Sequence, residues 1–128
     1  MLRSNPNVQN QYEFVCIEDL VLPNHPLRKI QKYIDFSFLL DLVRPYYCED
    51  NGRPSADPVM LFKMLFIGYM FSIRSERQLE LEVHSNNAYR WFLGLGLTDR
   101  VPDHSTLSYF RERLREGDVG RALSSFAA

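Results

Sequence analysis

The run from Val59 to Phe71 constrains the fold most, because a helix built from it is apolar on almost every side. Asp57-Pro58 stands directly before it and supplies a capping carboxylate and a proline at the first helical position. The run includes Lys63 and Gly68 and is shorter than the roughly 18 residues that a membrane span needs. A helix that is apolar all round has to be buried among other elements. The sequence therefore predicts a central helix with further helices packed around it.

Other segments carry helix-start signals of the same kind. Asn24-His25-Pro26 places proline near a first helical position, and Asp35 can cap a helix over residues 36–43. The Ser75-Glu76-Arg77-Gln78 run has the form of a capping box and predicts a helix to about Ser85. No stretch alternates apolar and polar residues long enough to indicate a sheet. We therefore predict an all-α fold, a compact bundle of five to six helices with a helix-turn-helix-like C-terminal part.

An apolar stripe at helical spacing follows this segment. Ala88, Trp91, Phe92 and Leu95 repeat at i, i+3, i+4 and i+7, and Gly94 acts as a stop signal. Aromatic residues in such a stripe usually pack inward. We therefore expect Trp91 and Phe92 to anchor the core and not to form a stacking platform for nucleic acid.

Charge and cysteine content limit the classes of function. The chain has 15 Lys and Arg residues against 16 Asp and Glu, a formal net charge of -1, which excludes a purely electrostatic DNA binder. Cys16 and Cys48 form no CxxC pair and are predicted to be reduced thiols in a cytoplasmic protein. The polar start of the chain lacks the apolar core of a signal peptide, and no membrane association is predicted.

The domain boundaries follow from these patterns. We expect a polar N-terminal segment at 1–13, one helical domain at 14–117 and a tail at 118–128. Within the domain, residues 46–56 are rich in turn formers and are predicted to form a loop, and Gly117 ends the last helix.

The predicted last helix, Ser105–Glu116, has a clear inner and outer side. Leu107, Phe110 and Leu114 share the side that must face the core, and Arg111 lies near its edge. The outer side combines hydroxyls, one tyrosine and arginine, which are side chains that bond phosphates or base edges. Following a tight turn, such a helix fits a recognition helix. The candidate DNA-binding residues on its outer side and flanks are Ser105, Thr106, Ser108, Tyr109, Arg113 and Arg115.

The same pattern also fits an ordinary solvated helix face, since Glu112 and Glu116 dilute the positive potential. Both interpretations stay open on this segment alone.

The sequence signals for catalytic residues are weaker than those for DNA-binding residues. Asp103-His104-Ser105 contains the residue types of a hydrolytic triad, but adjacent residues cannot converge on one reacting atom, so helix capping is the better interpretation. His25 and His84 lie far from it and from each other, without metal-ligand spacing. We predict no catalytic residue, no metal site and no cofactor.

Several short motifs follow one another in a fixed order along the chain. They are Gly52-Arg53-Pro54-Ser55-Ala56-Asp57-Pro58, Leu61-Phe62-Lys63-Met64-Leu65, Gly68-Tyr69, Ile73-Arg74-Ser75-Glu76-Arg77-Gln78-Leu79, Asn86-Asn87-Ala88-Tyr89-Arg90-Trp91-Phe92-Leu93-Gly94-Leu95 and Pro102-Asp103-His104-Ser105-Thr106-Leu107-Ser108-Tyr109-Phe110-Arg111. Together they resemble the N-terminal domain of insertion-sequence transposases of the DDE, RNase H-like class. The opening segment from Phe14 to Ile30, with its Leu22-Pro23-x-His25-Pro26-Leu27 run, looks like this family too, so the resemblance covers nearly the whole chain up to about Leu114.

The resemblance implies a helical module that helps to recognise the terminal inverted repeats of the element in double-stranded DNA. It implies that the chemistry lies in a later domain, where Asp, Asp and Glu hold two divalent ions. Residues 118–128 no longer look like the family's path toward its first catalytic Asp. We therefore expect a truncated chain that is not an enzyme and that binds DNA, with a homodimer or the full-length transposase as a further partner.

Two other functions remain open. The near-neutral charge favours a transposase dimerisation or interaction module with little DNA binding of its own. An intact small helix-turn-helix regulator is the third possibility, which the family resemblance disfavours.

Overall fold

The computed structural model describes residues 2, 4, 7–43 and 57–116, and all regular structure in them is helical. This confirms the all-α prediction: six helices have at least six residues, and a single turn precedes them. The predicted loop at 46–56, Cys48, the stop at Gly117 and the tail at 118–128 lie outside the described residues. The helices are α1 (Ile17–Leu20), α2 (Pro26–Tyr33), α3 (Phe38–Val43), α4 (Pro58–Met70), α5 (Glu76–Ser85), α6 (Asn87–Leu93) and α7 (His104–Glu116).

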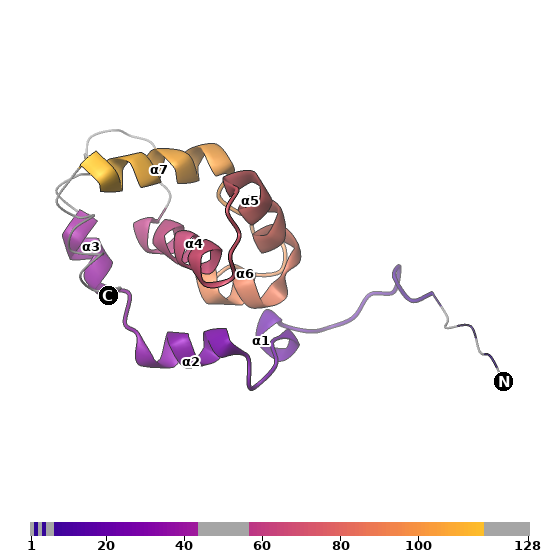
Figure 1. Ribbon diagram of the computed structural model, residues 1–128. Helices are drawn as coiled ribbons and strands as arrows, with labels where there is room; N and C mark the ends of the chain where they lie inside the picture. The colour runs from indigo at the N-terminus through magenta and orange to yellow at the C-terminus, as the bar shows by residue number, and fades with distance from the viewer. Residues whose placement is uncertain (1, 3, 5–6, 44–56, 117–128) are drawn as a thin grey trace.

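Helix α4 is the central element that its composition predicts. The backbone N–H of Val59 donates to Oδ1 of Asp57 (2.9 Å), and Pro58 occupies the first turn. Leu61, Met64 and Ile67 are buried. Helices α3, α5, α6 and α7 all contact α4, which lies in the middle of the bundle (Figure 1).

Short polar signals set the boundaries of α5 and α6. Oγ of Ser75 accepts the N–H of Gln78 (3.3 Å), which confirms the cap predicted for α5. Asn86 ends α5 through its own N–H and starts α6 by accepting the N–H groups of Ala88 and Tyr89 on Oδ1. One residue therefore turns the chain from one helix into the next. Gly94, with φ +83°, ends α6 in the left-handed conformation that glycine adopts without strain.

The helix predicted over residues 36–43 starts later than expected. Oδ1 of Asp35 accepts the N–H of Ser37 (2.9 Å), so these residues form a turn, and α3 begins only at Phe38. The turn directs Phe36 into the core, where its ring lies edge-on to those of Phe66 and Phe92, with centroids 5.9 and 5.7 Å away.

A lysine lies inside this aromatic cluster. The Nζ of Lys63 donates to Oε1 of Gln31 and to the carbonyl of Phe92, both at 3.1 Å. It also lies 5.2 Å from the ring centroid of Phe36, so the ammonium group has polar and π partners. Burial lowers the pKa of Lys63 from its ordinary value. The side chain joins α2, α4 and α6 at one point.

Trp91 does not anchor the core as expected. Phe92 is fully buried, but Trp91 is only partly buried on the side where α1 and α2 cover α6. Its indole N–H donates to the carboxylate of Glu18, and the guanidinium of Arg28 lies 4.8 Å from its ring centroid. Position 91 is at the edge of the apolar stripe, where a ring with a polar N–H can reach an acceptor. The prediction was right for Phe92 and wrong for Trp91.

The Trp91 contact belongs to a latch made of Glu18, Arg28 and Trp91. Arg28 donates to the Glu18 carboxylate and to the backbone carbonyls of Glu18, Val21 and Leu22. The hydrogen bond from Arg28, with that from Trp91, lowers the pKa of Glu18. The single turn α1, which no start signal in the sequence indicates, is therefore fixed to the bundle by its side chains.

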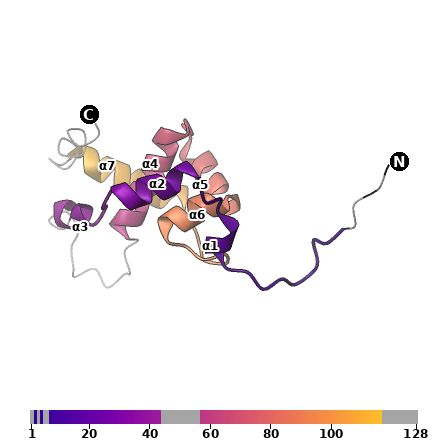
Figure 2. The same cartoon turned by 90° about the horizontal axis from the view of Figure 1, so that it is seen from below.

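The N-terminal segment leaves the bundle beyond this latch. Residues 7–16 contain no helix and run outward from α1 in both views (Figure 1, Figure 2).

None of the helices in the described ranges is long and apolar enough to cross a membrane.

Candidate nucleic-acid interface

Helix α7 begins at a well-formed cap. The backbone N–H of Thr106 donates to Oδ1 of Asp103 (2.7 Å), and this bond lowers the pKa of Asp103. The N–H of His104 donates to Oε1 of Glu80 (2.6 Å), and the His104 ring lies 3.3 Å from the same oxygen. Asp103 is therefore a helix cap, which confirms the interpretation that the sequence favoured over a hydrolytic triad.

The inner side of α7 is the predicted one. Leu107 and Phe110 are buried, and Leu114 packs against the core cluster. Nη1 of Arg111 lies 2.5 Å from Oε1 of Glu76, so Arg111 is engaged within the protein. Because His104 faces Glu80 and Arg111 faces the start of α5, the two helices run antiparallel. This packing fixes which side of α7 is turned outward.

The outer side of α7 carries four of the six candidate DNA-binding residues. At about 100° per residue, Ser105, Ser108, Tyr109 and Arg115 fall within one arc of the helix. Ser105 is exposed, Ser108 is half-buried, and the exposed fractions of Tyr109 and of the Arg115 side chain are 64% and 70%. These four side chains therefore lie together on the side of α7 that is turned outward.

The two flanking candidates behave differently. The guanidinium of Arg113 lies 5.4 Å from the ring centroid of Tyr109, and its Nη1 is 3.4 Å from the phenol oxygen, so Arg113 joins the outer group. Thr106 is half-buried next to the cap, apart from that group. Arg115 lies 3.7 Å from Glu112 in an exposed pair, and such pairs contribute only about 0–1 kcal/mol, so a phosphate or base can compete for it.

Two exposed arginines, Arg74 and Arg77, flank the Ser75 cap of α5, the helix that packs beside α7, and sequence reasoning missed them. Both are exposed at the start of α5, and the Arg111–Glu76 pair places the start of α5 beside the second half of α7. The only sequence signal is the clustering of two arginines around the Ser75 cap, and their proximity to α7 depends on tertiary packing.

A buried arginine sets the path of the chain into α7. Arg90 is 4% exposed and donates to the carbonyls of His84 (2.8 Å), Gly96 (3.0 Å) and Asp99 (2.8 Å). It thereby holds much of the connection at 94–103. This connection is longer than the tight turn we expected before α7 and than the three to four residues usual in a helix-turn-helix.

Within residues 2, 4, 7–43 and 57–116, no group of three His, Cys, Asp or Glu side chains is arranged to hold a metal ion. The polar side chains of the candidate interface are hydroxyls, one tyrosine and arginines on α7.

Comparison with known proteins identifies one matching family. The family described as transposase domain (DUF772) matches residues 15–113, which is most of the chain and includes α1 to α6 and most of α7. No curated protein and no solved structure gives a significant match. The chain belongs to the transposase domain family.

Proposed function

We propose that the chain is the DNA-binding module of an insertion-sequence transposase and that α7 recognises the terminal repeats of the element. One observation carries the proposal: the core fixes α7 by Leu107 and Phe110 and leaves Tyr109 and Arg115 turned to solvent. The partner is double-stranded DNA in the bacterial cytoplasm. Family membership supports a role in transposition, and the outer side of α7 supplies the side-chain chemistry for DNA.

The direct test is a gel-shift titration of the protein on DNA carrying the element's end, at several salt concentrations. A binder that neutralises phosphates loses affinity steeply as salt rises. Binding that prefers the element's end over a scrambled duplex, with a steep salt slope, is the expected result.

Arg115→Ala is expected to weaken this binding by roughly 1–3 kcal/mol. If Arg115 bonds a guanine, preference relaxes at one base pair; if it bonds a phosphate, affinity falls evenly on every sequence. Titration of the variant against a set of single-base substitutions distinguishes the two.

Lys29→Ala is the matched control for charge, because Lys29 is exposed on α2, across α4 from α7 (Figure 1). It should bind like the parent protein. The proposal for α7 is wrong if Arg115→Ala, Arg113→Ala and Tyr109→Ala all leave both the affinity and the salt slope unchanged.

A second candidate function is an interaction module that assembles transposase chains. The net charge of -1 and the pairing of Arg111 and Arg28 with carboxylates favour it, since both reduce the positive potential available to DNA. Weak binding that does not depend on salt would support this function over the first.

We also propose that residues 1–128 alone do not cut or join DNA. The acidic residues around α4, α5 and α7 already serve the fold: Asp57 and Asp103 cap helices, and Glu76 and Glu80 pair with α7. Incubation of labelled element-end DNA with the purified chain and Mg²⁺ or Mn²⁺ should release no product. Cleavage that persists after repeated purification and disappears with EDTA would contradict this prediction.

A further inference from the structure

The N-terminal arm, residues 7–16, exposes aromatic side chains that the bundle does not use. Tyr12 and Phe14 are fully exposed, and Val15 beside them is also exposed. In an extended segment, residues two apart point to the same side, so the two rings form one apolar face. Exposed apolar groups of this size, adjacent along the chain, are typical of a surface that contacts another protein.

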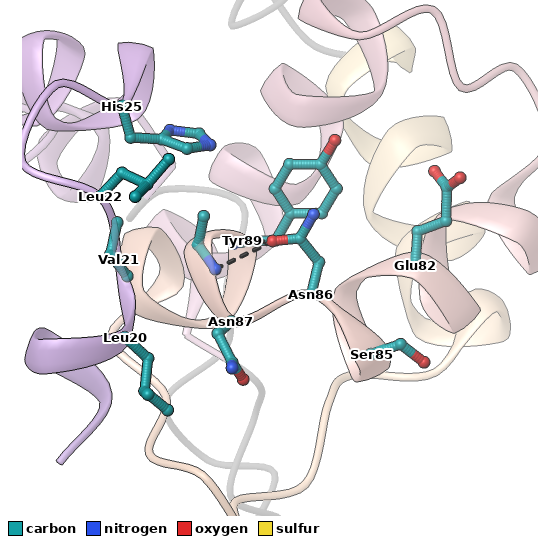
Figure 3. A pocket seen from close by; sticks show the side chains of 10 residues that line it. Leu20, Val21, Leu22, His25, Glu82, Ser85, Asn86, Asn87 and Tyr89 are labelled. Atoms are coloured by element: carbon teal, nitrogen blue, oxygen red, sulfur yellow. Dashed lines mark hydrogen bonds between the residues drawn. The ribbon is translucent and has the colours of Figure 1, made fainter. Parts of the chain in front are cut away.

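A groove that suits such a segment lies next to the base of the arm. It is open, has a volume of about 590 Å³ and runs between residues 20–25 and the junction of α5 and α6. Figure 3 shows Leu22 and His25 on one wall and Tyr89 and Asn86 on the other. The ring of Phe71 lies 5.3 Å from that of Tyr89 and packs against it. This volume is in the range of sites that enclose small ligands, and one or two aromatic rings fit within it.

The attachment of the arm keeps Phe14 out of the groove of its own chain. Glu18 is bound to Arg28 and Trp91, so α1 is fixed, and Cys16 before it has extended backbone (φ -109°, ψ 160°). Only two residues separate Phe14 from α1, whereas a reversal of the chain takes about four residues. Phe14 therefore follows the outward course of residues 7–16 (Figure 1, Figure 2), and a second copy of the chain carries the same groove.

We propose that two copies of this chain form a dimer by exchanging their arms, with Tyr12 and Phe14 of each copy in the groove beside Leu22 and Tyr89 of the other. The exchange is reciprocal, as a two-fold axis requires, so each dimer contains two identical contacts. Glu82 and Asn86 on the groove wall offer polar groups to the Tyr12 hydroxyl and to the backbone of the incoming segment. This dimer does not depend on DNA binding by α7.

Sedimentation equilibrium of the full chain over a wide concentration range measures the dimer constant. The 15.1 kDa chain should approach twice its mass as concentration rises. Phe14→Ser and, separately, Leu22→Glu should each raise the dissociation constant about tenfold or more, as expected for loss of a central anchor. Leu22 is 65% exposed, so its replacement leaves the core intact.

Two matched controls replace other exposed side chains, which lie outside the proposed contact. Tyr33→Ser removes an exposed ring from α2, and Leu81→Glu places a carboxylate on the outer side of α5. Neither should change the dimer constant. Melting curves of all four variants check that each of them is folded.

Mixing the two variants provides the most specific test of the exchange. The Phe14→Ser chain keeps its groove and the Leu22→Glu chain keeps its arm, so an equimolar mixture can form one of the two contacts. The mixture should therefore dimerise more strongly than either variant alone. A parent chain that stays monomeric at all concentrations, a dimer unaffected by both variants, or a mixture no stronger than its parts would each overturn the proposal.

Discussion

Phe92→Ala is expected to lower the free energy of unfolding by about 3–5 kcal/mol. The Phe92 ring is fully buried and packs against the rings of Phe36 and Phe66, at centroid distances of 5.7 and 6.1 Å. Alanine would leave a cavity between α4, α6 and Phe36 in the turn before α3 that rigid helices cannot close completely. Urea denaturation followed by circular dichroism measures the change.

Trp91→Ala, one residue earlier, is the control for this prediction. Its ring is only partly buried, so the loss should be smaller, although the latch with Glu18 and Arg28 also disappears. An equal or larger loss for Trp91→Ala would show that the latch, and not the aromatic cluster, dominates the stability of this region.

Arg90→Met is expected to destabilise the protein by a similar amount, about 3–5 kcal/mol, through a different cause. The variant keeps a long apolar side chain but leaves the carbonyls of His84, Gly96 and Asp99 without their donor. These three bonds are part-buried, and an acceptor that loses its partner costs at most about 1–3 kcal/mol. Thermal melting compared with Arg100→Met, which changes an exposed arginine in the same connection, isolates the effect.

The Arg90 prediction has a structural readout as well. Amide hydrogen exchange of residues 94–103 should become faster in Arg90→Met and stay unchanged in Arg100→Met. An unchanged melting temperature together with unchanged exchange would mean that the three bonds contribute nothing to the folded state.

The sequence predicted the parts of this fold that depend on neighbouring residues. Helix caps act over two to three residues, so Asp57, Ser75 and Asp103 could be read directly as helix starts. The inner side of α7 was also predictable, because helical spacing alone places Leu107 and Phe110 together.

The remaining features arise where distant segments meet. Glu18 reaches Trp91 and Lys63 reaches Gln31 across long stretches of sequence, and no local pattern indicates either contact. The same holds for the candidate interface: spacing places Tyr109 and Arg115 on the outer side of α7, but tertiary packing, including the pair between Arg111 and Glu76, brings the start of α5 beside this helix. Tertiary contacts, which periodicity does not encode, decide these positions.

The bonds of Arg90 to Gly96 and Asp99 have a practical consequence for anyone who labels or divides this protein. The tip at 97–98 is exposed and would usually be chosen for a tag, a fluorophore-bearing peptide or a circular permutation. Here both flanking carbonyls are tied to one buried guanidinium, so an added residue between them would have to break a bond or displace α7. The arm before α1, where Tyr12 and Phe14 are fully exposed, is the safer attachment point for a probe of the monomer.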